Sequence, residues 1–283
     1  MPRYKSYDFM SRGVTLRARK WWPDSGYPRA VVLCLHSWGD HSGRFEAFAR
    51  YLTGHGYAVY TFDFEGHGES PGHRAHIGDF DAWIADLTGF VGVVQNELRS
   101  VPMFLCGYSV GGLVAATYLS GSHLDIDGVI FNASALAEGR GITPVKRLAA
   151  SMIGGLAPRL GLSQITFGHQ MSRDPAEVAA FDDDPLIHHG KMDAGTGKAL
   201  LNATARIGKL LERIEIPLLI IHGTADPLAD PASAKALHEW CRGIDKTLKL
   251  YEGAMHDLFH EINRDEVFAD VRQWLDTRAG KGW

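Results

Sequence analysis

PMFLCGYSVGGLVAATYL, residues 102–119, places a G-x-S-x-G pattern between an apolar strand and a helix. The chain turns so tightly at Ser109 that its neighbours two positions away, Gly107 and Gly111, must be small, and the turn presents the hydroxyl at its tip. A five-residue pattern with three fixed positions also occurs by chance. The strand–turn–helix context makes it informative, and we predict that Ser109 is a nucleophile.

Outward from this stretch, short apolar runs alternate with longer helical patterns. Strands are predicted at 30–36, 57–64, 102–108, 127–134, 217–223 and 246–252, and helices at 43–55, 79–99, 110–121, 231–242 and 263–278. Most of the runs are continuously apolar, as in parallel strands that are buried on both faces. The alternation predicts an α/β fold with right-handed βαβ units in a mostly parallel sheet. Residues 4–22 are expected to add a pair of antiparallel edge strands.

One connection is far longer than the others. About eighty residues, from Leu136 to Arg213, separate two predicted core strands, whereas loops in α/β units usually take about 2–6 residues. This segment contains a stretch rich in small apolar residues, 147–162, and a helical pattern, 196–214. We therefore predict a single α/β core, 1–135 and 214–283, interrupted by an inserted cap subdomain, 136–213.

Composition narrows the class of protein. The 283 residues are 45% hydrophobic and 22% charged, with a net charge of −4 and no long run of one sign. Nucleic acid is therefore not an expected partner. The N-terminus lacks the apolar core of a signal peptide and no stretch reaches a membrane span, so we expect a cytoplasmic protein. Glycine is in excess, with 32 residues, and ten of these lie in the predicted cap.

A serine hydroxyl needs a base, and an imidazole base needs a carboxylate to hold its tautomer. The run PLLIIHG leads into TADPL and offers Asp226, and KTLKLYE leads into GAMHDL and offers His256. Both follow strands, in the chain order Ser, Asp, His that is typical of this fold. Asp230 and His260 compete, but Asp226 lies closer to its strand and His260 is expected to enter the last helix.

A zinc site is the alternative for the same segment. HDLFH, residues 256–260, resembles the zinc motif H-E-x-x-H with Asp257 in the glutamate position. That motif belongs on the face of one helix, whereas a strand and Gly253 lie just upstream. We therefore expect no metal and no cofactor, and we expect His36, His67 and His222 to hydrogen-bond loops near the site.

Acyl transfer also needs two backbone donors for the developing oxyanion. One is predicted at Val110, the residue after the nucleophile, which also begins a helix whose dipole favours negative charge. The second is expected in the loop HSWGDHSGR, residues 36–44, that follows the strand at 30–36. Within this loop we predict that the amide of Trp38 is the donor.

Six motifs resemble those of the monoacylglycerol lipase and lysophospholipase group of α/β-hydrolases, the serine aminopeptidase S33 type. They are HSWGDHSGRF (36–45), DFEGHGES (63–70), IGDFDAWIADL (77–87), DDPL (183–186), HGTADP (222–227) and HDLFHE (256–261). The resemblance extends over nearly the whole chain. This sequence departs from the group's pattern at Ser37, where glycine is usual, and at Asp40, Phe45 and Glu65.

The resemblance implies an α/β-hydrolase fold and a serine hydrolase that cleaves monoacylglycerols or similar medium- and long-chain esters through an acyl-enzyme. Asp40 and Arg44 match the group's polar residues beside the alcohol end of the pocket. They either position a glycerol hydroxyl or pair with each other to stiffen the loop. The apolar inner face of the cap is expected to take the acyl chain, and the cap to make at most transient contact with a membrane.

Other chemistries use the same triad. Thioesterases, peptidases, carbon–carbon bond hydrolases and perhydrolases remain alternatives, and so does a ligand-binding protein without turnover. A serine nucleophile disfavours dehalogenase and epoxide hydrolase chemistry, which use aspartate. The sequence makes no prediction of acyl-chain length or oligomeric state.

Overall fold

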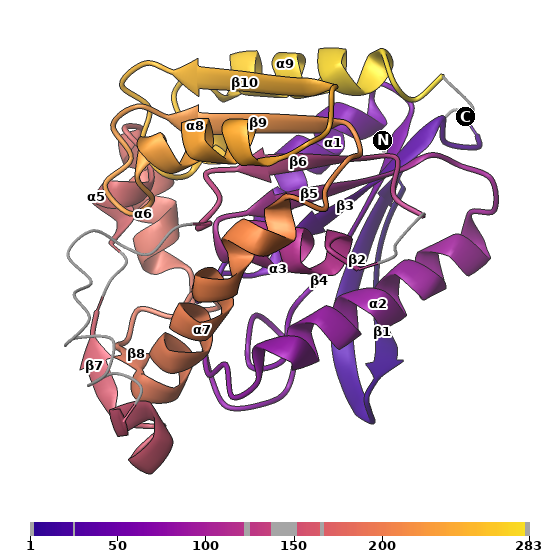
Figure 1. Cartoon of the computed structure of the whole chain (residues 1–283). Coiled ribbons are helices and arrows are strands. Elements are labelled where there is room, and N and C mark those ends of the chain that lie inside the picture. The colour runs from indigo at the N-terminus through magenta and orange to yellow at the C-terminus, as the bar shows by residue number, and fades with distance from the viewer. Residues whose placement is uncertain (1–2, 25, 122–124, 137–151, 165–166, 281–283) are drawn as a thin grey trace.

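A computed structural model describes residues 3–24, 26–121, 125–136, 152–164 and 167–280 (Figure 1). Its centre is one eight-stranded sheet in the order β1-β2-β4-β3-β5-β6-β9-β10. The strands are β1 (Arg3–Ser11), β2 (Val14–Trp22), β3 (Ala30–Leu35), β4 (Tyr57–Phe62), β5 (Met103–Tyr108), β6 (Gly128–Asn132), β9 (Leu218–Gly223) and β10 (Lys246–Tyr251). The six predicted core strands are confirmed, and each ends within about two residues of its expected bounds.

The main sheet is mostly parallel, and its central strands are buried. The strands β4, β3, β5, β6, β9 and β10 run parallel, and β1 and β2 add the expected antiparallel pair at one edge. Every residue of β3, β4, β5, β6 and β9 is buried, in keeping with their continuous apolar sequences. The strand β10 is largely half-buried because it forms the other edge.

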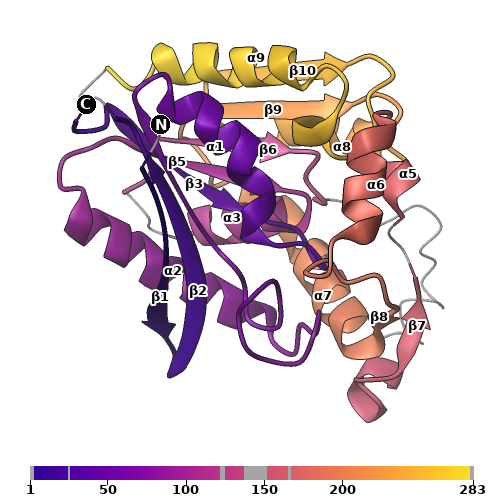
Figure 2. The ribbon, with the colours of Figure 1, turned by 180° about the vertical axis from the view of Figure 1, so that it is seen from behind.

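Helices cover both faces of the sheet (Figures 1 and 2). The five predicted helices are α1 (Glu46–Thr53), α2 (Phe80–Glu97), α3 (Val110–Leu119), α8 (Pro231–Trp240) and α9 (Arg264–Asp276). One apolar core contains side chains of α2, α3 and α8, and a second, on the opposite face, contains those of α1 and α9. No helix in the described part of the chain has both the length and the apolar character needed to span a bilayer.

Between β6 and β9 the described residues add no strand to the main sheet. The described elements here are β7 (Gly161–Ser163), α5 (Gly168–Met171), α6 (Pro175–Asp183), β8 (Met192–Asp193) and α7 (Ala194–Leu211), and β7 pairs only with β8. The helix α7 corresponds to the predicted pattern at 196–214 and buries Ala203, Ile207 and Leu211 against the main core. Residues 137–151, which include the start of the small-residue stretch, lie outside the described residues.

The sheet order places the candidate residues together. From β3 the chain proceeds to β4 on one side, and β5 lies on the other side of β3. In parallel α/β sheets this reversal of strand order opens a crevice at the carboxyl ends of the strands. The loops after β3, β5, β9 and β10 all leave from that edge, and they carry Trp38, Ser109, Asp226 and His256 respectively.

Candidate active site

Ser109 occupies a strained turn between β5 and α3. Its backbone has φ 50° and ψ −114°, a conformation that non-glycine residues rarely adopt and that costs about 1–3 kcal/mol. The turn requires its glycines: a Cβ on Gly107 would lie 2.6 Å from the Cα of Gly112, and one on Gly111 would lie 2.2 Å from the carbonyl oxygen of Leu35. The sequence therefore bends the chain around Ser109 as the motif predicts.

Asp226 and His256 contact each other. The Nδ1 atom of His256 lies 2.7 Å from Oδ2 of Asp226, and both side chains are buried. The other carboxylate oxygen accepts hydrogen bonds from the backbone amides of Leu228, at 2.8 Å, and Ala229, at 3.0 Å. The competing Asp230 caps the N-terminus of α8.

The surroundings of Asp226 keep it ionised. Burial opposes its ionisation, but the charge of His256 and hydrogen bonds from His222 and His256 outweigh it and hold the pKa of Asp226 well below its usual range. A carboxylate that accepts from Nδ1–H fixes the tautomer of His256 and leaves Nε2 as the proton acceptor. His256 therefore has the arrangement that a general base needs.

The loop that carries His256 is held by α5. The amide of His256 donates to the carbonyl oxygen of Gln170, at 3.4 Å, and the amide of Asp257 donates to that of Met171, at 2.8 Å. The ring of Tyr108 lies 5.3 Å from that of His256, and its hydroxyl contacts Sδ of Met171. The sequence analysis missed Gln170 and Met171, since backbone contacts leave no side-chain pattern.

The loop after β3 forms a tight turn at Trp38. The amide of Asp40 donates to the carbonyl oxygen of Ser37, at 3.3 Å, and Gly39 has φ 75°, as the third residue of a type II turn requires. The Trp38 indole is buried and donates to the carbonyl oxygen of Ala75, at 2.6 Å. These contacts fix the peptide of Trp38.

Val110 begins α3, so its amide has no acceptor within the helix. The strands that lead to the two predicted donors are hydrogen-bonded neighbours, with Leu35 of β3 opposite Gly107 of β5. The amides of Trp38 and Val110 therefore belong to adjoining loops at one edge of the sheet. Their role as oxyanion donors stays a prediction.

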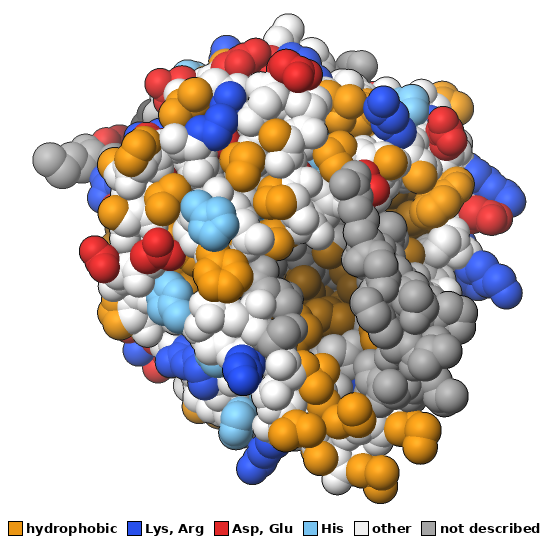
Figure 3. All heavy atoms as spheres, turned by 90° about the vertical axis from the view of Figure 1, so that its left-hand side faces the viewer, with side chains coloured by type: hydrophobic (Ala, Val, Ile, Leu, Met, Phe, Trp, Pro, Cys, Tyr) orange, Lys and Arg blue, Asp and Glu red, His pale blue; other side chains and the backbone are white. Residues whose placement is uncertain are grey.

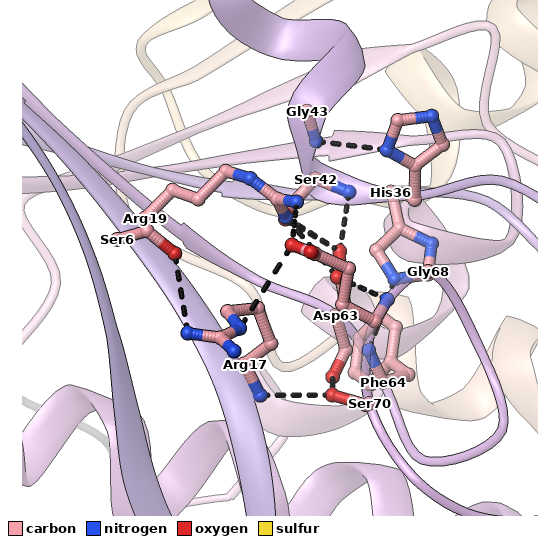
Figure 4. A network of polar contacts seen from close by, with 12 residues as sticks. Ser6, Arg17, Arg19, His36, Ser42, Gly43, Asp63, Phe64, Gly68 and Ser70 are labelled. Carbon is pink, nitrogen blue, oxygen red and sulfur yellow. Dashed lines mark hydrogen bonds and ion pairs between the residues drawn. The ribbon is translucent and has the colours of Figure 1, made fainter. Parts of the chain in front are cut away.

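A buried carboxylate, Asp63, anchors the far end of the Trp38 loop (Figure 4). Oδ1 of Asp63 accepts from the amide of Ser42, at 2.7 Å, and Oδ2 accepts from the amide of Glu69, at 2.9 Å. Arg19 forms a buried ion pair with Asp63 at 3.1 Å. Asp63 is the first residue of the DFEGHGES motif, whereas Arg19 is 44 residues away on β2 and no spacing pattern connects them.

Three further histidines hydrogen-bond loops beside the site, as predicted. Nε2 of His36 accepts from the amide of Phe64 at 3.0 Å, and burial lowers the pKa of His36, in keeping with a neutral ring. Nδ1 of His67 lies 3.0 Å from the carbonyl oxygen of Glu65. Nε2 of His222 lies 3.1 Å from the carbonyl oxygen of Ala229, in the loop after β9, and 3.0 Å from Oδ2 of Asp226.

Arg44 lies in a buried cluster of charges. Its guanidinium contacts Asp40, at 3.2 Å, and Asp257, at 2.6 Å, and Asp257 also contacts Nδ1 of His260, at 2.8 Å. Asp40 and Arg44 therefore pair, one of the two arrangements expected for them. Together with Tyr108 they line a cavity of about 10 Å³, roughly the space for one water molecule.

The two histidines of the zinc-like motif have different partners. His256 contacts Asp226, whereas His260 contacts Asp257 and ends a short 3-10 helix, Leu258–His260. The two imidazoles are thus not presented on one face of a single α-helix. In the described ranges no group of three or more His, Cys, Asp or Glu side chains is arranged to hold a metal ion.

Comparisons with known proteins gave matches in both sequence and fold. The family model described as "Serine aminopeptidase, S33" matches residues 26–263. A monoglyceride lipase of Mus musculus is 35% identical over 93% of this chain and 88% of its own length. The crystal structure of Paleococcus ferrophilus monoacylglycerol lipase superposes with a TM-score of 0.83 at 30% identity, covering 93% of this chain and 99% of its own. A soluble variant of monoglyceride lipase from Saccharomyces cerevisiae, in complex with a substrate analog, gives 0.87 at 25% identity, covering 99% and 96%.

Proposed function

Because this chain belongs to the serine aminopeptidase S33 family, and within it to the monoacylglycerol lipase-like α/β-hydrolases, we propose that Ser109, His256 and Asp226 hydrolyse the ester bond of monoacylglycerols. The chain is a carboxylic ester hydrolase. The observation that supports the assignment of residues most is the strained backbone of Ser109 at the sheet edge where Asp226 orients His256. Strain of this kind persists where the surrounding structure enforces it, and it gathers at active sites.

The first half-reaction forms an acyl-enzyme. Oγ of Ser109 attacks the ester carbonyl carbon while Nε2 of His256 takes the hydroxyl proton. The carbonyl oxygen becomes an oxyanion that accepts from the amides of Trp38 and Val110. When the tetrahedral intermediate collapses, the carbon–oxygen bond to glycerol breaks and His256 returns the proton to the leaving alkoxide. Asp226 stays ionised and stabilises the imidazolium.

The second half-reaction releases the acid. A water molecule gives a proton to Nε2 of His256 and attacks the acyl carbonyl, and a second oxyanion forms between the same two amides. Collapse of this intermediate restores Ser109 with the proton held by His256 and releases the fatty acid. Each oxyanion donor of this kind is typically worth about 10²–10³ in kcat.

We assign the alcohol end of the substrate to the loop that carries Asp40 and Arg44. Both side chains are only 9% exposed, they line one cavity with Tyr108, the residue before Ser109, and their ion pair holds Asp40 in place. The carboxylate can accept a hydrogen bond from a glycerol hydroxyl. A small alcohol leaving group such as p-nitrophenol would not need this contact, so its loss should affect monoacylglycerols more.

The acyl end is assigned to a cap formed by residues 136–213. The described part of this segment exposes Met152, Leu156 and Leu160, with relative exposures of 58%, 85% and 53%. Figure 3 shows apolar side chains gathered on this side of the molecule and in the walls of a hollow beside them. We propose that the hollow takes the acyl chain and that the apolar surface makes transient contact with lipid. The cytoplasmic location stays a prediction.

Two measurements test the proposed function. The first is hydrolysis of monoacylglycerols and p-nitrophenyl esters of rising chain length, with thioester and peptide substrates for comparison. The second is labelling by a fluorophosphonate, which forms a covalent adduct only with an activated serine. We expect ester turnover, an adduct on Ser109 and loss of both in Ser109→Ala.

Three results would contradict the proposal. Substantial ester turnover by purified Ser109→Ala would show that Ser109 is not the nucleophile. Faster turnover of a thioester or peptide than of any ester would favour the corresponding alternative. Absence of an adduct together with tight binding of a monoacylglycerol would favour a ligand-binding protein.

A further inference from the structure

A turn of the inserted segment makes three contacts with the Trp38 loop. Oδ2 of Asp184 lies 2.9 Å from Nε2 of His41, and the amide of His188 donates to the carbonyl oxygen of Gly39 at 2.7 Å. The ring of His188 also packs edge-on against that of Trp38, with centroids 5.5 Å apart. These contacts join residues about 143 positions apart in the chain.

The pairing of His41 with Asp184 has a defined direction. Nδ1 of His41 accepts a hydrogen bond from the amide of Gly43, at 3.2 Å. The ring proton is therefore on Nε2, which donates a hydrogen bond to Asp184. Burial opposes ionisation of Asp184, but the hydrogen bond from His41 outweighs it and lowers the pKa of this carboxyl. Its other oxygen accepts from the amide of Leu186, at 2.8 Å, which holds the turn in shape.

The contacts surround the peptide that bears the predicted oxyanion donor. Gly39 directly follows Trp38, and its φ of 75° places its carbonyl oxygen where the His188 amide can reach it. His41 begins the next turn of the same loop. Asp63 anchors this loop only from Ser42 onward. The segment from Trp38 to His41 is therefore held on its other side by the turn at 184–188.

We propose that Asp184 is a positioning residue for the oxyanion hole: through His41 it holds the loop so that the Trp38 amide points at the oxyanion. This inference rests on the proposed function. It gives the inserted segment a second role, in addition to the proposed binding of the acyl chain. Because a misplacement of about 1 Å can cost about 10²-fold in rate, a single hydrogen bond at this position has a measurable effect on kcat.

The decisive comparison is Asp184→Asn against Asp183→Asn, since Asp183 is exposed on the same segment. Both variants are assayed with p-nitrophenyl acetate, which is too short to use an acyl pocket, and with a long-chain ester. For Asp184→Asn we expect kcat to fall at least about tenfold with both esters while KM changes less than about twofold. Asp183→Asn should match the wild-type enzyme. A loss confined to the long-chain ester, or to KM, would overturn the inference, because it would mean that Asp184 only holds the acyl pocket.

Two substitutions of His41 separate its two hydrogen bonds. In His41→Asn, the side-chain oxygen lies near the position of Nδ1, so it can still accept from the amide of Gly43, but the donor to Asp184 is lost. In His41→Gln, the side-chain NH₂ group lies near the position of Nε2, so it can still donate to Asp184. We expect His41→Asn to reproduce the loss of Asp184→Asn, the double variant to be no worse than either, and His41→Gln to retain more activity. Additive losses would show that the two residues act separately and would overturn the inference.

The affinity for a short alkyl boronic acid distinguishes a misplaced oxyanion donor from a general loss of folding. The boronate forms a tetrahedral adduct with the nucleophile, so its affinity should fall in Asp184→Asn by the same factor as kcat, while thermal stability and inhibition by the fatty acid product stay near wild-type values. Equal weakening of boronate and product would contradict the inference. If the wild-type enzyme neither turns over esters nor accepts a fluorophosphonate, the proposed function itself fails. An active wild type with unaffected Asp184→Asn refutes only the positioning role.

Discussion

Asp226 reaches His256 across two strands: Oδ2 of the carboxylate, which follows β9, lies 2.7 Å from Nδ1 of the imidazole, which follows β10. The paired strands run parallel, so their carboxyl ends bring the two loops together. Two backbone amides hold the other carboxylate oxygen, which leaves Oδ2 to the imidazoles of His256 and His222. The carboxylate therefore sets both the orientation and the tautomer of the His256 imidazole.

Asp226→Asn should lower kcat for ester hydrolysis by about 10⁴-fold, since an amide in this position favours the wrong imidazole tautomer. Its fold should persist, because Asn can still accept from the two backbone amides. Steady-state kinetics with p-nitrophenyl butyrate measure the loss. Asp230→Asn, at the cap of α8, is the matched control and should keep nearly full activity. A larger loss in Asp230→Asn than in Asp226→Asn would reverse the assignment of the acid.

The buried pair of Arg44 with Asp257 makes stability depend on pH. Burial opposes ionisation of Asp257, but His260 and Arg44 outweigh it and hold the pKa of this carboxyl well below its usual range. The unfolded chain therefore binds more protons than the native one near pH 4, so the free energy of unfolding rises with pH there. The contribution of Asp257 is fully present above the ordinary carboxyl pKa of about 4 and is lost as the pH falls below it.

Asp257→Asn should accordingly lower the free energy of unfolding by about 3 kcal/mol at pH 7, because it leaves the buried Arg44 with one carboxylate fewer. The difference from wild type should shrink as the pH falls from about 5 towards 3. Urea unfolding at a series of pH values measures both effects, with the exposed Asp183→Asn as control. A difference that stays constant over this pH range would refute the electrostatic account.

Local patterns in the sequence predicted the sheet and the proposed centre for identifiable reasons. The core strands are continuously apolar because helices cover them on both faces, and the motif glycines around Ser109 are required by atoms within a few ångströms. Asp226 and His256 were predicted because each follows a strand closely, and the structure brings the two side chains into contact. In a parallel sheet that position alone places a residue at the site.

The contacts that the sequence did not reveal join segments far apart in the chain. Arg19 pairs with Asp63, His41 with Asp184 and Arg44 with Asp257, and none of these pairs has a characteristic spacing. Each partner by itself is typical of an ordinary surface residue. Burial creates the need for the opposite charge, and burial is decided by tertiary packing.

The elbow at Ser109 should not tolerate a larger residue at Gly111. A Cβ there would lie 2.2 Å from the carbonyl oxygen of Leu35 and 2.8 Å from that of His36, both backbone atoms that cannot move aside alone. We expect Gly111→Ala to destabilise the protein by at least about 3 kcal/mol, beyond the usual range for a single substitution, and to abolish labelling of Ser109.

Gly92→Ala provides the matched control for this substitution. Gly92 lies within α2, and nothing lies within 4 Å of a Cβ built on it, so alanine should stabilise the helix by about 0.5–1 kcal/mol. Thermal unfolding followed by circular dichroism compares the two variants. Equal midpoints for Gly111→Ala and wild type would show that the elbow relaxes more freely than its contacts indicate.

Ser37 departs from the glycine of the motif that this loop resembles, and the structure explains why a side chain is tolerated. Its φ is not positive, and its contacts in the turn are made by its carbonyl oxygen, which accepts from Nδ1 of His36, at 2.7 Å, and from the amide of Asp40. Ser37→Gly should therefore leave kcat within about twofold and lower the free energy of unfolding by roughly 0.5–1 kcal/mol, because glycine gains freedom in the unfolded chain. Ser37→Ala, which keeps Cβ and loses the hydroxyl, should show neither change. A tenfold change in kcat for Ser37→Gly alone would mean that Cβ shapes the oxyanion hole, and the same change in both variants would mean that the hydroxyl does.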